Sequence, residues 1–368
     1  MMRRLVCRPA ARSVQRGLTL VEVMVAMTIG IILLLALGTL FANSTRVFKR
    51  SDDFARMQEN GAYALNAIGS DLRQTGFYGY ISSNDIQIPT ATVITNDCGT
   101  GTAWATNFAQ PLFGFIEGVS TTLADASMPC INASNLISSA LPDRPSFILV
   151  VRGATGIRVL PVPAALEAAT LYVQSDPNGG ILFRGDQYPP EASTLRRTTL
   201  VPAVDNPDWP YAPIYPYQAR AYYLRPCSRP TGGGGVCLAT DDGNQPIPTL
   251  VRQELVGTTM GERAVAEGIE AVRILYGVDN DGNGTPDVYT ETPTAVQFAQ
   301  VVTARVSVLV RSPKPTNGYS DDSRDYDLNG DGVAELNCTD DGLPCNYHRH
   351  VFTQSFQVRN IAQRLESS

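Results

Sequence analysis

The N-terminal part of the chain carries two hydrophobic patterns in succession. Val23–Phe41 is almost wholly apolar. A helix of that length rises about 28 Å at 1.5 Å per residue, close to a bilayer core of roughly 30 Å. Farther on, apolar residues recur mostly at spacings of three or four, which places them on one face of a helix. The members of this stripe are Val47, Phe54, Met57, Gly61, Leu65, Ile68 and Leu72.

No proline lies between Gly17 and Pro89, so the two patterns can share one helix. We expect it to run from Leu18 to Thr75, with Gly76 and Gly79 ending it. Beyond Tyr80 the pattern changes to short β-branched and aromatic runs separated by Gly, Pro, Asn and Asp, which predicts strands. They are Ser146–Arg152, Thr170–Val173, Ile181–Arg184, Arg220–Leu224, Glu270–Val278, Val301–Arg311 (half-buried) and Val351–Arg359. The stretches 81–145, 185–219 and 227–262 are expected to be irregular insertions.

Basic residues gather before the apolar run. Arg3, Arg4, Arg8, Arg12 and Arg16 precede it, and the first 16 residues contain no acid. Such an excess places the N-terminus in the cytoplasm and everything after the run outside. A secretory signal peptide has a shorter apolar core and a small-x-small cleavage site, neither of which fits this segment.

Gly17-Leu-Thr-Leu-Val-Glu22 stands between the basic leader and the apolar run. A carboxylate inside a bilayer is costly, so Glu22 could simply lie at headgroup level. The whole setting, however, resembles the class III signal of type IV prepilins. The resemblance implies cleavage by a prepilin peptidase between Gly17 and Leu18, methylation of the new N-terminus, and an assembly role for Glu22, whose buried charge a neighbouring subunit's amine could neutralise. Leu18 stands where the family usually has Phe.

Later segments resemble the PilW family of type IV minor pilins. They are Asp71–Gly79 at the helix exit, Gly268–Asp279 and Arg305–Arg311. The resemblance implies an α+β, pilin-like fold, with one long N-terminal helix packed on an antiparallel β-sheet that carries large loop insertions. The implied divisions are a cleaved leader (1–17), the transmembrane and assembly half of the helix (18–42), its amphipathic half (43–76) and a β-rich extracytoplasmic head (77–368).

The same resemblance implies a function. The protein would help to prime type IV pilus assembly at the bacterial inner membrane, as a single-pass N-in, C-out protein. It would then enter the pilus near its tip, in support of motility, adhesion and DNA uptake. The implied partners are other minor pilins, the major pilin, the prepilin peptidase and a tip adhesin. Two alternatives stay open, a J-type pseudopilin of type II secretion and a tip-exposed adhesive binding module.

Composition weighs against two other classes of protein. With 29 Lys and Arg against 35 Asp and Glu, nucleic acid is not expected as the main direct partner. An enzyme is not expected either, because the chain has 2 His and lacks the G-x-S-x-G, H-E-x-x-H and dinucleotide-binding motifs. A tyrosine cluster fits packing of an insertion better than a carbohydrate surface. Its members are Tyr211, Tyr215, Tyr217, Tyr222 and Tyr223.

Two acidic loops share the pattern D-x-[DN]-x-[DN]-G-x-x-[DE], which opens an EF-hand loop. Alternating oxygens on a tightly turning loop can converge on Ca²⁺, so we expect calcium at one or both loops rather than ordinary Asx-Gly turns. Thr290 and Cys338 occupy the twelfth positions, which excludes a true EF-hand. The candidate ligands are Asp279, Asp281, Asn283, Thr285 and Asp287 in the first loop, and Asp327, Asn329, Asp331, Val333 and Glu335 in the second.

The chain has 7 Cys, an odd count for an exported protein. Removal of the leader takes Cys7 away and leaves six. Pairing of neighbours in sequence gives disulfides Cys98–Cys130, Cys227–Cys237 and Cys338–Cys345, one connectivity of about 15. Zinc at Cys338, Cys345, His348 and His350 is a weaker alternative, since an oxidising compartment favours disulfides.

Overall fold

The computed structural model describes residues 17, 19–81, 85–90, 92, 94–95, 97–98, 104–117, 119, 122, 126, 128–137, 146–159, 165–177, 179–188 and 212–361. The chain divides into two compact units, with the boundary between Asp53 and Phe54. Helix α1 (Leu20–Gln74) contributes to both. Residues 1–16 of the expected leader, together with Leu18, lie outside the described residues.

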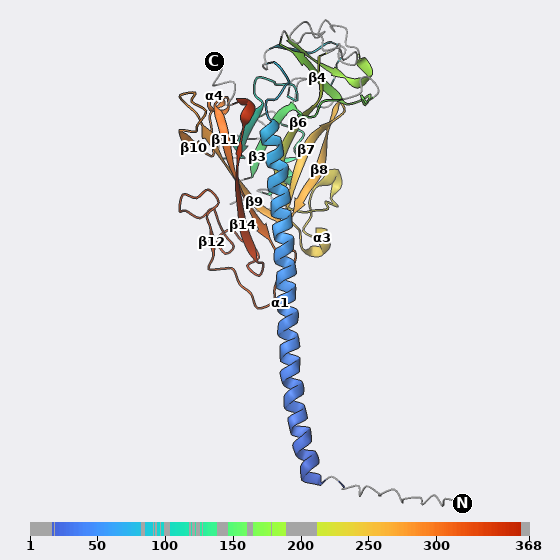
Figure 1. Cartoon of the computed structure of the whole chain (residues 1–368), viewed down its shortest axis with the longest axis vertical. Helices are drawn as coiled ribbons and strands as arrows, with labels where there is room; N and C mark the ends of the chain where they lie inside the picture. Colours follow the sequence, from blue (N-terminus) through green and yellow to red (C-terminus); the bar gives the residue numbers. More distant parts are fainter. Residues whose placement is uncertain are drawn as a thin grey trace, which may run out of the picture. The chain divides into compact units, whose positions relative to one another are not determined.

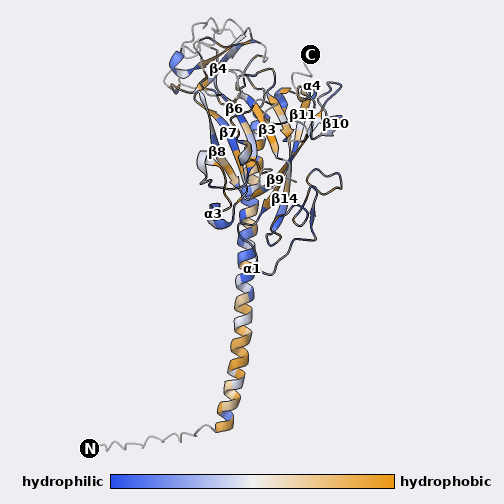
Figure 2. Cartoon of the chain, turned by 180° about the vertical axis from the view of Figure 1, so that it is seen from behind, coloured by the Kyte–Doolittle hydropathy of each residue, from blue (hydrophilic) through white to orange (hydrophobic). Residues whose placement is uncertain are grey.

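From Val23 to Phe41, within the first unit, α1 exposes apolar side chains all round, and Figure 2 draws this part of the helix largely in the hydrophobic colour. Leu34 is 70% exposed and Phe41 76%. The hydroxyl of Thr28 donates to the carbonyl of Val25 at 2.9 Å, so even the polar side chain is satisfied within the helix, as hydrocarbon surroundings require. By length and composition, α1 can cross a membrane.

In the second unit, α1 buries one stripe against the head. Gly61 and Gly69 let the helix backbone approach two aromatic rings closely. A Cβ at Gly61 would lie 2.6 Å from Cδ2 of Phe352, and one at Gly69 would lie 2.1 Å from Cε1 of Phe356. The buried residues of the helix are Met57, Gly61, Ala64, Leu65, Ile68, Gly69, Asp71 and Leu72. The expected amphipathic stripe is therefore buried from Met57 to Leu72, whereas its first two members, Val47 and Phe54, are 66% and 42% exposed.

The first sheet has eight strands, all antiparallel except the β1/β5 pair. Strand β6 is its hub, because it pairs with β4 near its start, with β3 in its middle and with β7 toward its end. The order is β1 (Ile86–Gln87), β5 (Gly179–Arg184), β4 (Leu171–Asp176), β6 (Ile214–Arg225), β3 (Phe147–Ala154) and β2 (Leu112–Ile116), with β7 (Thr249–Val256) and β8 (Thr259–Glu267) branching from β6.

The second sheet is wholly antiparallel, and Figure 1 shows its strands together on one side of the head. Its order is β10 (Val288–Thr290), β9 (Ile269–Val278), β11 (Val301–Arg311) and β14 (Arg349–Gln357). A small ribbon joins β12 (Asp325–Tyr326) to β13 (Leu336–Asn337). The short helices are η2 (Ala133–Asn135), η3 (Gly185–Gln187), η4 (Gly233–Gly235), α3 (Asp241–Asn244) and α4 (Ala295–Phe298).

One core joins the helix to both sheets. It contains Ile68 of α1, Leu149 of β3, Val272 of β9 and Val306 of β11, each almost fully buried. Each such aliphatic side chain contributes about 1.5–3 kcal/mol relative to exposure. The head thus depends on the C-terminal part of α1 as a structural member.

The exit from α1 is hydrogen-bonded to β3. Gly76 adopts a φ of 74°, which favours glycine and turns the chain out of the helix. Its amide donates to the carbonyl of Arg152 at 2.9 Å, and the amide of Ala154 donates to the carbonyl of Phe77 at 2.6 Å. A Cβ at Gly153 would lie 2.6 Å from the carbonyl oxygen of Gln74, so the helix end and the strand touch backbone to backbone.

The predicted α+β, pilin-like architecture is confirmed, with three corrections. The stretch 227–262 is not irregular throughout, because β7 and part of β8 form a hairpin there. Likewise, β2 lies within the expected loop 81–145 and the start of β6 within 185–219. The sheet is divided in two rather than single. Strand Val301–Arg311 is not half-buried, because the segment that follows it covers its outer face, so Ser307 and Arg311 are 2% and 6% exposed.

Candidate functional site

The start of α1 carries the predicted processing and assembly residues. Gly17 and Thr19 precede the helix, and Glu22 lies in its first turn with an exposed side chain. The amide of Glu22 donates to the hydroxyl oxygen of Thr19 at 3.2 Å, the bond of an N-cap. A T-x-x-E pattern was thus readable in the sequence as a helix start. Cleavage and the assembly role of Glu22 stay predictions.

The first acidic loop joins β9 to β10. Asp279 is its hub: the amides of Gly282 and Gly284 donate to its two carboxylate oxygens, each at 2.7 Å. Although burial opposes it, these backbone bonds lower the pKa of Asp279 below its ordinary value. Carboxylate oxygens of Asp279, Asp281 and Asp287 lie within 4.8 Å of one another. The loop therefore brings three of the five predicted ligands together.

The side chains of the other two predicted ligands of this loop are bonded to their neighbours. Asn283 donates from Nδ2 to Asp281 Oδ2 at 2.9 Å, and its Oδ1 accepts from the amide of Thr285 at 2.8 Å. Thr285 stands at the seventh position, where loops of this kind offer a backbone carbonyl.

The second loop lies between β12 and β13 and repeats this arrangement. Asp327 accepts from the amides of Gly330 at 2.5 Å and Gly332 at 2.9 Å, and these bonds lower the pKa of its carboxyl. Oxygens of Asp327, Asp331 and Glu335 again lie within 4.8 Å of one another. Burial raises the pKa of Glu335. The remaining members are Asn329, whose Oδ1 accepts from the Asp331 amide, and Val333 at the carbonyl position.

Both loops fit a hard divalent cation by the chemistry of their donors. Three carboxylates at such spacing repel one another, and a cation would offset that repulsion. Arg305 links the two loops: its guanidinium donates to the carbonyl of Asn329 in the second loop and lies 6.0 Å from the ring of Tyr289, just after the first. Whether either loop binds metal stays a prediction.

Three disulfides cross-link the head. The structure joins Cys98 to Cys130, Cys227 to Cys237 and Cys338 to Cys345, the three local pairs expected from the sequence. With Cys338 and Cys345 bonded to each other, no pair of thiolates faces His348 and His350, so the zinc interpretation is wrong. Of the tyrosine cluster, Tyr217, Tyr222 and Tyr223 are buried in the cores, Tyr215 is half-buried, and Tyr211 lies outside the described residues.

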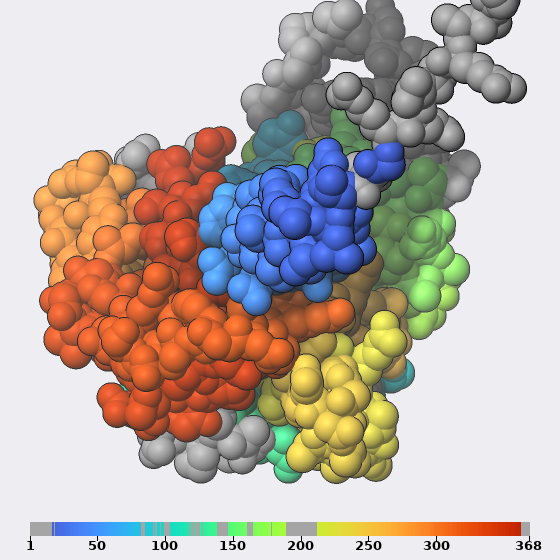
Figure 3. Space-filling view, turned by 90° about the horizontal axis from the view of Figure 1, so that it is seen from below, coloured from blue at the N-terminus to red at the C-terminus, as the bar shows by residue number. Residues whose placement is uncertain are grey.

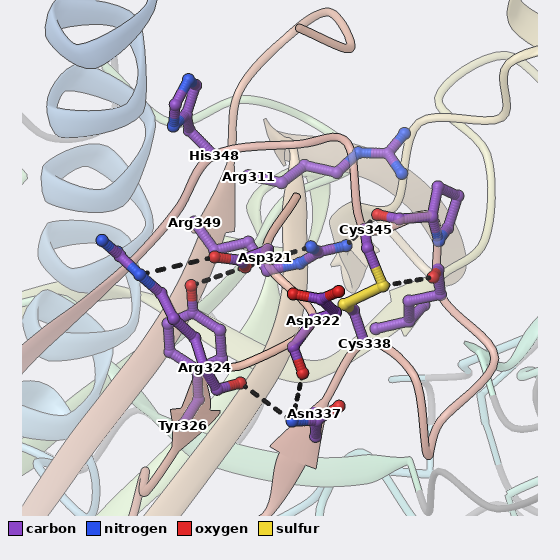
Figure 4. Close-up of polar contacts among 12 residues, drawn as sticks. Arg311, Asp321, Asp322, Arg324, Tyr326, Asn337, Cys338, Cys345, His348 and Arg349 are labelled. Atoms are coloured by element: carbon purple, nitrogen blue, oxygen red, sulfur yellow. Dashed lines mark hydrogen bonds and ion pairs between the residues drawn. A yellow bond between two sulfur atoms is a disulfide. The ribbon is translucent and has the colours of Figure 1, made fainter. Parts of the chain in front are cut away.

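A buried ion network, which sequence reasoning missed, fixes the segment between β11 and β14 (Figure 4). Arg349 donates from Nε to Glu270 Oε2 at 2.5 Å and from Nη1 to Asp321 Oδ2 at 3.3 Å. Tyr326 and Tyr319 also donate to Asp321, each at 2.7 Å. The one signal available was the presence of Glu270 in β9, a strand whose other residues are mostly apolar.

Figure 3 shows the C-terminal segment, in orange and red, gathered on one face of the molecule beside the yellow residues near 240. Arg311 connects the two areas, because its Nη1 lies 3.5 Å from Oε1 of Glu270 and its Nη2 donates to the carbonyl of Pro246 at 2.6 Å. The network therefore extends from the acidic second loop region to the loop of α3.

Two family models match the chain. Residues 237–360 match the model described as type IV pilus-assembly protein W, and residues 12–38 match the prokaryotic N-terminal methylation motif. The first match contains β7 to β14 with both acidic loops, and the second contains Gly17 and Glu22. No curated protein and no solved structure matches.

Proposed function

We propose that this chain, which matches the models of the PilW family and of the prepilin-type methylation motif in part of its length, acts as a minor pilin of a type IV pilus. One observation carries the proposal: the methylation motif includes the start of a helix that is apolar on all sides from Val23 to Phe41. The same helix is built into the core of the head in its second unit. Such a helix can anchor a subunit in a membrane and later pack among other pilin helices. This role is structural rather than catalytic.

The proposed sequence of events follows from the charges and the apolar surface. The leader arginines hold the N-terminus in the cytoplasm, the head folds outside, and the peptidase cuts between Gly17 and Leu18. Assembly with other minor pilins and the major pilin moves the helix from lipid into a filament. There Glu22 would pair with the N-terminal amine of a neighbour, because an unpaired carboxylate is costly in apolar surroundings. We place the subunit near the tip, where it primes assembly beside a tip adhesin and supports motility, adhesion and DNA uptake.

A deletion strain complemented with variants tests this proposal. We expect deletion to abolish most surface pili and Glu22→Gln to fail in complementation, although the variant accumulates in the membrane. Glu59→Gln, which changes an exposed acid of the same helix, should complement fully. Mass spectrometry of the wild-type protein should find an N-methylated terminus at Leu18. Normal piliation without the gene, or a mature chain that keeps residues 1–17, would contradict the proposal.

We further propose that the two acidic loops bind Ca²⁺. Asp279, Asp281 and Asp287 would hold the first ion, and Asp327, Asp331 and Glu335 the second, with the side-chain or carbonyl oxygens of Asn283, Thr285, Asn329 and Val333 completing each shell. The ions would stiffen the β9–β10 loop of the second sheet and the loop of the β12/β13 ribbon. A site saturated at about 100 times its Kd stabilises the folded state by about 2.7 kcal/mol.

Calorimetric titration of the detergent-solubilised full chain tests the calcium sites. We expect the wild-type chain to bind two ions. Asp279→Asn and Asp327→Asn should each bind only one. Asp340→Asn, an exposed acid close to the second loop, serves as the control and should keep both. In thermal melting, Ca²⁺ should raise the melting temperature above its value in chelator, and Mg²⁺ should not. An unchanged melting temperature together with no heat of binding would rule the sites out.

A further inference from the structure

A cavity of about 300 Å³ opens on the first sheet, where β6, β7 and β8 lie side by side. Arg220 comes from β6, Arg252 and Glu254 come from β7, and Arg263 comes from β8. Leu171 at the start of β4 adds an apolar wall. Three guanidinium groups from three strands thus face one small space.

Two carboxylates partly neutralise these guanidinium groups. Glu254 is the inner partner: it pairs with Arg252, and it lies 3.6 Å from Nε of Arg220 and 3.6 Å from Nη1 of Arg263. Asp71, from α1, lies beneath and contacts Nη1 of Arg220 at 2.5 Å. The group therefore carries three positive charges and two negative ones, which leaves one positive charge unbalanced.

The guanidinium group of Arg263 remains available to a ligand. The side chain of Arg263 is 69% exposed, and its ion pair with Glu254 is long, at 3.6 Å. Among the described residues, Nε of Arg252 also has no hydrogen-bond partner, but it is buried and out of reach of a ligand. Planar guanidinium groups with free donors bind carboxylates and phosphates in a two-pronged manner. An excess of one charge matches a single carboxylate, whereas a phosphate dianion would leave the group negative overall.

We propose that this cavity binds one carboxylate carried on a short aliphatic stem, as in a glutamate side chain. The carboxylate lies between Arg263 and Arg220, and the stem packs on Leu171 and Leu255. Either a free carboxylic acid or an acidic side chain of a peptide has this chemistry. The inference does not depend on the role in pilus assembly.

Calorimetric titration of the detergent-solubilised full chain with N-acetyl-glutamate α-methylamide tests the inference. We expect saturable binding, with no binding of the neutral N-acetyl-glutamine α-methylamide and weaker binding of phosphate. A peptide of alternating Glu and Ala separates the two sources: it should bind more tightly than the blocked amino acid if a protein chain supplies the carboxylate, and no more tightly if a free acid does.

Two variants assign the binding to this cavity. Arg263→Gln should weaken it roughly tenfold, since one charge-assisted contact is lost, while Arg359→Gln, an exposed arginine elsewhere, should leave it unchanged. Glu254→Gln removes the resident competitor and should tighten binding of the same probe, provided that its melting temperature shows a folded protein. Absence of saturable binding, tighter binding of phosphate than of carboxylate, or equal affinity in Arg263→Gln would overturn the proposal.

Discussion

Arg349 and Glu270 form an ion pair with Nε and Oε2 2.5 Å apart, and neither side chain is exposed. They lie on β14 and β9, with β11 between them in the sheet. Arg349 also donates to the carbonyl of Pro344 at 2.9 Å, next to Cys345. One guanidinium group therefore holds the disulfide-closed segment against the sheet that bears the first acidic loop.

Replacement of this arginine should be costly. Arg349→Met leaves two buried carboxylates, Glu270 and Asp321, short of a cation, and breaking such a pair costs about 3–5 kcal/mol. We expect urea denaturation of the full chain to show that loss in the free energy of unfolding. The double variant Glu270→Leu/Arg349→Met should recover only part of it: Glu270 is no longer left without a cation, but Asp321 still lacks Arg349 and Arg311 loses Glu270. A single-variant loss below about 1 kcal/mol would mean that water or Arg311 compensates.

Gly69→Ala should destabilise the head although alanine is the better helix former. The new methyl group would meet the ring of Phe356, and overpacking of a core costs about 1–3 kcal/mol, more than the gain in helix propensity of about 1 kcal/mol. The additional change Phe356→Leu should relieve part of the loss. Gly261→Ala is a suitable control, because a Cβ there meets open space. Equal melting temperatures for Gly69→Ala and the wild type would disprove the close contact.

Acid should loosen the loop closed by Cys227 and Cys237. The amide of Leu238 donates to Asp241 at 2.7 Å. This backbone bond lowers the pKa of that carboxyl below its ordinary 3.8. Asp242 behaves alike, since backbone bonds from Ile247 and Ser228 outweigh its burial and lower its pKa too.

The sign follows from those directions. A lowered pKa in the folded state contributes stability above the unfolded value, near 3.8, and that contribution disappears as the pH falls through the folded value. Hydrogen exchange of residues 228–247, corrected for intrinsic rates, should show less protection at pH 3 than at pH 5, with β11 unchanged. Asp242→Asn should weaken protection at both pH values and flatten the difference. Equal protection in the wild type at both would refute the assignment.

Local periodicity was sufficient for the long helix and for strands such as Val301–Arg311. It failed for the β7–β8 hairpin, which was predicted as an irregular stretch. Thr249–Val256 mixes Arg, Gln and Glu with apolar residues and lies close to the glycine-rich 232–235. Its strand character therefore depends on pairing with β6 and β8. The covered outer face of β11 was equally hidden, because the covering segment, around Leu336, follows later in the chain.

The acidic loops were readable because their ligands fall within nine residues of one another. The arginine cavity was not, since Asp71, Arg220 and Arg252 meet only through the packing of α1 on two strands. The same holds for Glu270 and Arg349, whose partnership crosses a sheet. Charged residues in apolar strands indicate buried pairs in general, but sequence alone does not say which partners they find.

The backbone hydrogen bonds that join the exit of α1 to β3 have a mechanical consequence. Tension along the helix axis is transmitted through Gln74 to Gly76 and Phe77. The backbones of these two residues are hydrogen-bonded to Arg152 and Ala154. No slack loop absorbs the load, so tension reaches the first sheet and its shared core at once. The head should therefore stay folded under tension until that core itself yields.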